Sequence, residues 1–461
     1  MAGSLVLALA CGATLLTFLD TTVVNIAFPE IQKSLPSASF AHLTWIVTSY
    51  TTVFAALLTT AGRCSDALGH RKVFTVAVVV FTLASASCAV SANLTMLVIS
   101  RVVQGVGAAA LIPSALGLVL VNTPPERRTK AIGYWGAAGA VAAVVGPAVG
   151  GSVTNWVSWR MIFAINLPIG LVMIYGALRH LRWSAEPRTG RLPDLLGTAL
   201  ITVGIGSLVV GLSQAGDWGL ASARVLALTL GGLLVTAAGV LRSRGHRAPA
   251  IDLGLFRIQT FAAANAAVAL FSGAMYIILL VSPLYLTDLW HYSLFEAALS
   301  VTPGAFASLV VSLYLGKRAT PRVQRVATMV GAACLLVTSV TMYGVLNDHR
   351  SFWVWLPFSV GGGVAAGLVL TALSAAVAVS VPPTKFAASI GLLTTSRQAG
   401  GSLGIAIMAA MLSGSRAGHP EQIRDVFLVC AVGALLALVP TPFLHRRVQA
   451  PVPAPDPAQS S

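Results

Sequence analysis

Residues 17–28, TFLDTTVVNIAF, end an apolar run that begins at Leu5, and they include one acidic residue, Asp20. An apolar run of this length predicts a helix that crosses the roughly 30 Å hydrocarbon core of a bilayer. A charged carboxylate inside such a helix costs about 2.5–3.5 kcal/mol on insertion scales. The whole chain has only 14 acidic residues. Asp20 is therefore a candidate functional residue, the alternative being an acid close enough to the helix end to reach water.

The composition of the chain indicates a membrane protein. Of its 461 residues, 56% are hydrophobic and only 9% are charged, whereas soluble proteins carry about 25% charged residues. This excludes an ordinary soluble enzyme. A net charge of +15 would suggest a nucleic-acid partner in a soluble protein. Here the positive charge is spread over short loops, so we predict no nucleic-acid partner.

Apolar windows of about 20 residues recur along the chain, each long enough to cross a bilayer. They predict an all-α polytopic membrane protein with fourteen transmembrane helices. The predicted spans are residues 5–28, 43–61, 73–92, 95–120, 132–153, 159–181, 194–213, 223–241, 261–286, 295–316, 326–345, 353–380, 387–411 and 426–444. The first run lacks a preceding basic region, so we predict a retained helix and not a signal peptide.

The distribution of Lys and Arg predicts the orientation. Alternate loops hold 21 basic residues against 6 in the others, if the chain starts inside and crosses fourteen times. Because cytoplasmic loops are enriched in Lys and Arg, we expect both termini to be cytoplasmic. Arg outnumbers Lys 24 to 5, which suggests a GC-rich bacterial genome. We therefore predict a multi-pass protein of the bacterial cytoplasmic membrane.

The sequence contains no signature of an enzyme, a metal site or a cofactor site. Its five cysteines are scattered, mostly within apolar segments, and fit neither a disulfide framework nor a metal cluster. A Walker A sequence is absent, so ATP is not expected to drive the protein. The catalytic patterns GxSxG and HExxH are absent as well. We predict no catalytic residues, no metal and no cofactor.

Two pairs of segments repeat faintly: residues 105–116 resemble 363–374, and residues 62–73 resemble 316–326. Such repeats are typical of transporters in which two similar bundles surround a central site. We predict four parts: an N-terminal six-helix bundle (1–181), an inserted transmembrane helix pair with cytoplasmic linkers (182–258), a C-terminal six-helix bundle (259–449), and a Pro-rich, disordered cytoplasmic tail (450–461).

Four motifs resemble the helix-1, loop 2–3, helix-4 and helix-5 signatures of the major facilitator superfamily. They are LDTTVVNIAFP (19–29), GRCSDALGHRK (62–72), SRVVQGVGAA (100–109) and GAVAAVVGPAVGG (139–151). The segments SWRMIFAINLPIG (158–170) and TSRQAGGSLGIA (395–406), with the fourteen spans, resemble the drug:proton antiporter family, which includes bacterial multidrug and antibiotic exporters. The resemblance implies the major facilitator fold and transport by alternating access.

Asp20 and Arg101 are the intramembrane charges expected to act together. An unpaired buried arginine is costly, and an arginine that loses its carboxylate partner to a proton is a switch. Gln104, within one turn of Arg101, could hold the guanidinium in place. The alternative is that each charge snorkels to water. The resemblance implies proton coupling for Asp20 and proton transfer for Arg101.

The loop motif predicts a conformational latch. Its residues are Gly62, Asp66, Gly69, Arg71 and Lys72. We expect Asp66 near a helix N-terminus, where it can accept backbone N–H groups and pair with Arg71 or another basic residue. A solvated, topology-determining loop is the alternative. The family's usual arginine and leucine are Ala67 and Cys64 here, which weakens the expected latch.

The helix-5 segment GPAVGG favours export. Gly146, Gly150 and Gly151 would let another helix approach closely, and Pro147 would bend the helix. Ordinary tight packing is the alternative. The resemblance implies the antiporter motif that uptake symporters generally lack.

Candidate residues of a substrate cavity are aromatic or polar positions within the predicted spans, although aromatic residues of membrane helices also serve packing and interfacial roles. They are Asn25, Trp45, Tyr50, Trp135, Asn166, Phe271 and Arg397. For Arg397 two placements stay open: the cavity, or the cytoplasmic interface with lipid headgroups.

The function predicted from these features is a proton-coupled efflux antiporter that exports small hydrophobic drugs or an antibiotic. Its expected partners are the substrate, protons and the lipid bilayer, and we predict a functional monomer. The alternative is a proton-coupled uptake symporter of a small nutrient, which would need a more polar cavity and does not explain GPAVGG. A membrane enzyme or sensor would need groups that the sequence lacks.

Overall fold

The computed structural model describes residues 2–181, 194–246, 249, 253–316, 320–345, 351–381, 386–412 and 420–444, and these ranges contain helices and no strand. The helices before residue 182 are α1 (Ala2–Ser34), α2 (Phe40–Leu68), α3 (His70–Ala89), α4 (Leu94–Asn122), α5 (Pro125–Trp156), α6 (Met161–Ala164) and α7 (Asn166–His180). Next come α8 (Leu195–Ser213), α9 (Ala215–Trp218), α10 (Ala223–Gly245) and the short 3-10 helix η1 (Leu253–Arg257). The remaining helices are α11 (Gln259–Leu284), the π-helix η2 (Tyr285–Leu289), α12 (Leu294–Gly316), α13 (Pro321–Val345), α14 (Phe352–Ser380), α15 (Phe386–Leu412), α16 (Pro420–Leu438) and η4 (Thr441–Phe443).

Twelve helical segments of the described chain are long and apolar enough to cross a membrane. Two further helices, α5 and α15, have 32 and 27 residues and are not among those twelve. The protein is therefore an all-α, multi-pass membrane protein, and the number of fourteen spans stays a prediction. The predicted tail (450–461) and most of the predicted linker before α8 lie outside the described residues.

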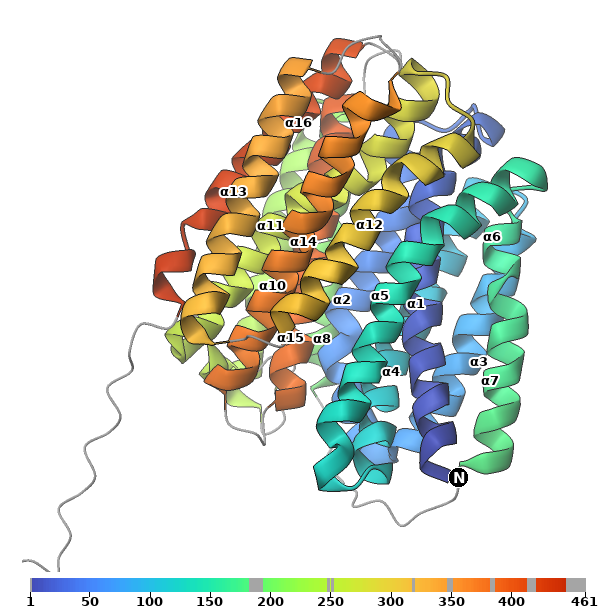
Figure 1. Ribbon diagram of the computed structural model, residues 1–461, viewed down its shortest axis with the longest axis vertical. Coiled ribbons are helices and arrows are strands. Elements are labelled where there is room, and N and C mark those ends of the chain that lie inside the picture. Colours follow the sequence, from blue (N-terminus) through green and yellow to red (C-terminus); the bar gives the residue numbers. More distant parts are fainter. Residues whose placement is uncertain are drawn as a thin grey trace, which may run out of the picture.

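The long helices pack as two groups, shown in blue to green and in yellow to red in Figure 1. We call α1–α7 the first bundle and α11–α16 the second bundle. Within the first bundle, α1 packs against α4, α5 and α7, and α4 packs against α2 and α3. Within the second, α11 packs against α15 and α16, and α14 packs against α12 and α13. The bundles meet where α2 packs on α15, where α5 packs on α12, and where α1 packs on α11 and α12.

The hydrophobic cores show where the bundles are joined. At the end of the first bundle that holds the α1–α2 connection, residues such as Phe28 and Phe40 share one core with Tyr285 and Trp290 of the second bundle. At the end that holds the N-terminus, the first bundle has a separate core that includes Leu9 and Phe74. The bundles therefore share a continuous core toward the α1–α2 connection and not toward the N-terminus.

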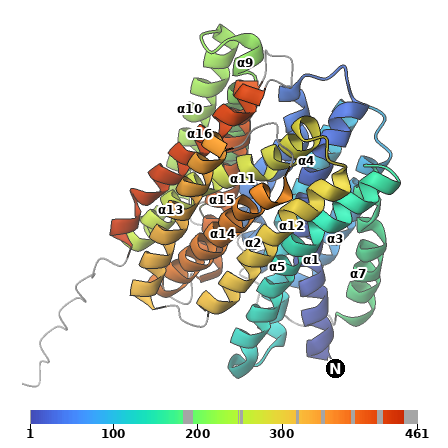
Figure 2. The same cartoon turned by 45° about the horizontal axis from the view of Figure 1, so that its top comes forward.

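Helices α8 and α10 form a pair that packs against the two bundles. The pair is held by close backbone approach, since a Cβ on Gly232 would lie 2.6 Å from the Gly204 carbonyl oxygen. Helix α8 packs on both α2 and α15. In the view of Figure 2, α9 and α10 lie at the edge of the molecule opposite α7. The pair thus lies beside the α2–α15 contact between the bundles.

Asp194 begins α8 and also joins it to α10. Its Oδ1 atom accepts the Gly197 N–H at 2.8 Å and the Arg242 Nε–H at 3.1 Å. Burial raises the pKa of the Asp194 carboxyl, but these donors outweigh burial and hold the pKa below its usual value.

We expect Asp194→Ala to destabilise the α8–α10 pair by about 1–2 kcal/mol, the usual cost of losing a helix cap. Because the folded-state pKa is depressed, the charge-dependent part of the stabilisation is present above the unfolded pKa. It is lost as pH falls through the folded pKa. Thermal unfolding of the purified protein at several pH values measures both parts. Asp194→Asn is the control, since it keeps a capping oxygen. A wild type–Asn difference that persists unchanged in acid would contradict this assignment.

Candidate functional site

Asp20 lies near the middle of α1 and is completely buried, with 0% of its surface exposed. Three side chains from two other helices donate to its carboxylate. Arg101 Nη1 lies 2.5 Å from Oδ2, and Gln104 Nε2 and Asn166 Nδ2 lie 2.8 Å and 3.0 Å from Oδ1. Arg101 is also buried, with 1% exposure. Helices α1, α4 and α7 thus place one carboxylate among a cation and two amides.

The guanidinium of Arg101 is held from several sides. Its Nε donates to the Ile46 carbonyl oxygen of α2 at 3.0 Å, and its Nη1 donates to Gln104 Oε1 at 2.8 Å. The Tyr50 ring lies against it, with Arg101 Cζ 4.1 Å from the ring centroid, at a distance suited to a cation–π contact. The position of the cation is therefore fixed independently of Asp20.

Ser85 of α3 links the two amides that hold Asp20. Its Oγ accepts from Asn166 Nδ2 at 3.0 Å and from Gln104 Nε2 at 3.4 Å, and it donates to the Phe163 carbonyl oxygen at 2.9 Å. The sequence prediction included neither Ser85 nor the contact of Asn166 with Asp20. No sequence signal distinguishes Ser85 from the other small polar residues of the predicted span 73–92.

This arrangement has a defined response to a proton. The ionised carboxylate is an acceptor only, and it receives hydrogen bonds from three donors. A proton on either carboxylate oxygen turns that oxygen into a donor. The new O–H group then faces an N–H donor of Arg101, Gln104 or Asn166. Protonation also removes the negative charge that faces Arg101. The site can therefore exist in two discrete hydrogen-bonding states.

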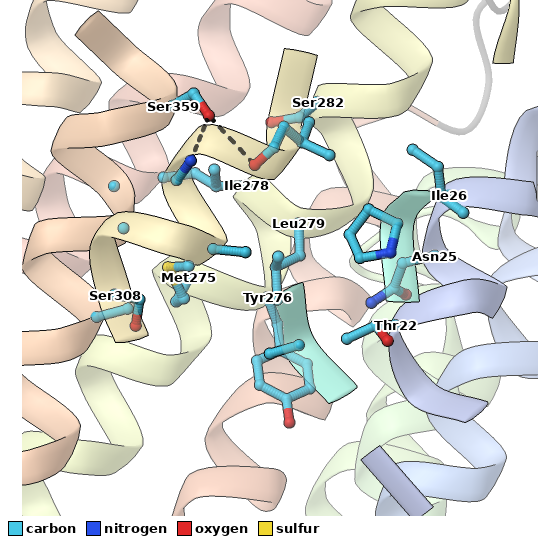
Figure 3. A pocket seen from close by; sticks show the side chains of 18 of the residues that line it. Thr22, Asn25, Ile26, Met275, Tyr276, Ile278, Leu279, Ser282, Ser308 and Ser359 are labelled. Atoms are coloured by element: carbon cyan, nitrogen blue, oxygen red, sulfur yellow. Dashed lines mark hydrogen bonds between the residues drawn. The ribbon is translucent and has the colours of Figure 1, made fainter. Parts of the chain in front are cut away.

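A cavity of about 250 Å³ lies between the two bundles. Its walls come from α1, α5, α11, α12, α13, α14 and α15. In Figure 3, Thr22, Asn25 and Ile26 of α1 lie across from Met275, Tyr276 and Leu279 of α11, with Ser308 and Ser359 farther along the second bundle. Most of the lining is apolar, with a small number of hydroxyl and amide groups, which is typical of small-molecule sites.

The structure separates the seven predicted cavity residues into two sets. Asn25, Phe271 and Arg397 line the cavity. The other four do not line it. Tyr50 and Asn166 belong to the Asp20 cluster, Trp45 donates to Ser213 Oγ of α8 at 3.2 Å, and Trp135 packs against the core of the first bundle. The sequence gives the residue type, but apolar helices surrounded by lipid and protein carry little periodicity that would show which face meets the cavity.

Arg397 lies well inside α15, eleven residues after its first residue, Phe386. Its Cζ lies 5.5 Å from the Phe18 ring centroid of α1. Of the two placements left open by the sequence, the structure shows the cavity.

The predicted latch differs from expectation at Asp66. Helix α2 continues to Leu68, so Asp66 lies in its last turn and not near a helix N-terminus. Its Oδ1 lies 3.9 Å from His70 Nε2, a contact that is an ion pair only when the imidazole is protonated. Arg71 Nη2 donates to the Leu178 carbonyl oxygen at 3.4 Å.

Of the other latch residues, Gly69 and Lys72 lie at the α2–α3 turn, and Gly62 lies within α2. Gly69 makes that turn with a φ of 96°, which favours glycine. Gly62 packs against Pro113 of α4, and Lys72 is exposed.

The glycines of GPAVGG bring α5 close to two helices. Gly146 lies against Thr22, and a Cβ on Gly150 would lie 2.6 Å from Ile26 Cγ2, both on α1. Gly151 instead faces Ala298 of α12 and would bring a Cβ 2.9 Å from the Leu294 carbonyl oxygen. Pro147, between them, lines the cavity. The motif therefore packs α5 within the first bundle and against the second.

We expect Gly151→Val to force α5 away from α12 and to reduce transport strongly, with overpacking destabilising the protein by about 1–3 kcal/mol. Thermal unfolding and a transport assay on matched amounts of protein measure the two effects. The smaller change Gly151→Ala should cause a smaller loss of the same kind. Adding Ala298→Gly to Gly151→Ala should restore part of that loss, because it removes the methyl group that the new Cβ meets. Equal loss in the single and double variants would show that α5–α12 packing is not the cause.

Two bundles around a cavity, with an intramembrane ion pair beside it, define a secondary transporter. Residues 10–405 match the sequence profile of the Major Facilitator Superfamily. The chain belongs to this superfamily, and it is a transporter and not an enzyme.

The similar proteins include exporters. The cephamycin export protein CmcT of Amycolatopsis lactamdurans is 33% identical over 95% of this chain and 92% of its own length. The multidrug export protein EmrB of Escherichia coli K12 is 29% identical over 90% of this chain and 81% of its own. These relatives confirm the prediction, made from the motifs, that the chain is related to the drug:proton antiporter family.

Solved structures agree on the fold. The human organic anion transporter MFSD10 (TETRAN) has a TM-score of 0.66 to this chain, covering 96% of this chain and 99% of its own, at 16% identity. At that identity the likeness concerns the fold alone.

Proposed function

We propose that the protein is a proton-coupled antiporter that exports small hydrophobic molecules, drugs or an antibiotic, from bacterial cytoplasm by alternating access. The observation that carries the proposal is the buried cluster of Asp20, Arg101, Gln104 and Asn166 in the first bundle, near a mostly apolar cavity between the bundles. A protonatable group in contact with a fixed cation can couple a proton to a change of bundle contacts.

The cycle that we propose begins with a proton from outside. Protonation of Asp20 weakens its hold on Arg101 and favours the return to the inward-facing state. Substrate entering from the cytoplasm or inner leaflet then favours deprotonation and outward opening. A membrane potential of 100 mV supplies about 2.3 kcal/mol for each charge moved. That free energy can sustain a substrate concentration ratio of roughly fiftyfold across the membrane.

The topology that we propose has fourteen spans, adding α5 and α15 to the twelve segments that are long and apolar enough. It comprises the two six-helix bundles and the inserted pair α8–α10, in the cytoplasmic membrane with both termini inside. In this orientation the bundles are joined by a continuous core on the outer side. Because the bundles are closed against each other on the outer side and not on the cytoplasmic side, the conformation is inward-facing.

Export is favoured over nutrient uptake by two observations. The cavity lining is mostly apolar, whereas a nutrient symporter would need more polar groups. Two similar proteins, the cephamycin export protein CmcT and the multidrug export protein EmrB, are exporters by name.

Transport into energised everted membrane vesicles tests the proposal. Ethidium and anilinonaphthalenesulfonate provide a cationic and an anionic fluorescent probe. We expect uptake of at least one probe that stops when the pH gradient is dissipated. Vesicles without the protein are the control. Probe uptake driven equally well without a proton gradient would exclude the antiporter.

A further inference from the structure

The charge of the cavity points to the kind of molecule it binds. Among the described residues that line it, Arg397 is the one charged side chain, and acidic side chains are absent from that lining. Asp20, the nearby acid, is buried and engaged by its own three donors. The electrostatic environment of a ligand in the cavity is therefore set by a single guanidinium.

The neighbours of Arg397 on α15 are engaged in hydrogen bonds, whereas the Nε–H of Arg397 is not, in the part of the chain that the structure describes. Thr395 Oγ1 donates to the Ala55 carbonyl oxygen at 2.8 Å, and Ser396 Oγ donates to Asn265 Oδ1 at 2.8 Å. Tyr276 donates its hydroxyl to Gln398. These bonds fix the helix on both sides of Arg397. The Arg397 Nε–H, however, is buried and has no hydrogen-bond partner among the described residues.

A buried, unpartnered donor on a charged group is expensive, and an ionised acceptor satisfies it best. The Phe18 ring, 5.5 Å from Arg397 Cζ, offers a π face but no acceptor oxygen. An anion is therefore the ligand that suits this donor best, and a planar carboxylate or a sulfonate matches the donor geometry of guanidinium.

A second unsatisfied polar group lies farther along the same wall. Asn25 is 5% exposed and lines the cavity, and its Oδ1 has no hydrogen-bond partner within the described part of the chain. It is visible next to Thr22 in Figure 3. Phe18 and Asn25 are seven residues apart on α1, which places them on one face about 10.5 Å apart at 1.5 Å per residue. The wall therefore offers a cation near one end and an amide near the other.

We propose that the substrates of this cavity are lipophilic organic anions whose carboxylate or sulfonate binds Arg397 and whose body lies on the apolar walls. A larger substrate places a further polar group against Asn25. This assignment rests on the proposed export function, because it concerns the same cavity. Lipophilic cations of the same size bind more weakly, since nothing in the described lining neutralises them.

Binding to the purified full-length protein tests the assignment without a proton gradient. The probes are naphthaleneacetate, its neutral amide naphthaleneacetamide, and the cation naphthylethylammonium, which share one aromatic body. Titration calorimetry at neutral pH gives the three affinities. We expect the anion to bind roughly tenfold to a hundredfold more tightly than the amide, as a charge-assisted hydrogen bond provides, and the cation to bind most weakly.

The variants separate recognition from packing. Arg397→Gln should reduce the anion-to-amide affinity ratio to near one, chiefly by weakening binding of the anion, and Arg397→Lys should keep a preference for the anion. Arg179→Gln, which removes an exposed positive charge at the end of α7, is the matched control and should keep the wild-type ratio. A purely structural Arg397 would instead change all three affinities together.

Two results would overturn the inference: equal affinities for the three probes in the wild type, or an undiminished anion preference in Arg397→Gln. These outcomes are independent of the vesicle assay. Proton-driven transport without anion preference removes this assignment and leaves the exporter. Anion preference without proton-driven transport keeps the binding site and removes the proposed antiport.

Discussion

Asp20→Asn is expected to reduce proton-driven transport to the background of vesicles without the protein. Asn keeps the shape of the side chain and one acceptor oxygen for Arg101, but it cannot bind and release a proton. The protein should still insert, because a hydrogen bond to Arg101 remains possible. Uptake of the transported probe into everted vesicles, at matched expression of the wild type and the variant, measures the effect.

Counterflow separates coupling from substrate binding for the same variant. Vesicles preloaded with unlabelled substrate should still exchange labelled substrate through Asp20→Asn, since exchange needs no proton. Asp20→Glu is the matched control; it keeps the titratable group one methylene farther out and should retain part of the driven transport. If Asp20→Asn pumps normally, the coupling proton binds elsewhere.

Arg101→Gln is expected to be the more damaging change to stability. It leaves the Asp20 carboxylate buried without a cation, and breaking a buried ion pair by removing one partner costs about 3–5 kcal/mol. Arg101 also donates to Ile46 and stacks on Tyr50, so its loss affects the α2–α4 contact. Thermal unfolding of the purified variant measures the cost.

The double variant Asp20→Asn/Arg101→Gln decides whether the charge pair causes that cost. With both charges removed, amides can hydrogen-bond each other, and much of the lost stability should return although transport does not. The two side chains are in direct contact, so their effects should be strongly non-additive. Additive losses would mean that Arg101 stabilises the protein through its packing on Tyr50 and its bond to Ile46 instead.

The core of the Asp20 site could be predicted because charges inside a membrane need partners. Asp20, Arg101 and Gln104 were brought together on this argument, and the structure places all three in contact. Neutral polar residues carry no such requirement. Asn166 and Ser85 therefore could not be assigned to the site from the sequence, although they complete its hydrogen bonds.

Helix faces and helix ends were harder to predict than spans. Trp45 and Trp135 were candidate cavity residues, yet one faces α8 and the other the core of the first bundle. Tryptophan occurs in cavities, at helix contacts and in interfacial belts of membrane proteins alike, so residue type does not separate these positions. The sequence places Asp66 near a helix start, but α2 continues to Leu68 and the turn occurs at Gly69, where the backbone adopts a positive φ.

The inserted helices have unequal attachments to the two bundles. Near one end of α8, Trp45 donates to Ser213 and His42 lies 3.0 Å from Gln214; near the other, the Thr60 and Thr198 hydroxyls lie 2.5 Å apart. Directional bonds at both ends tie α8 to α2. If the two bundles rock against each other, α8 should move together with the first bundle. The surface that slides should then be the contact between α8 and α15.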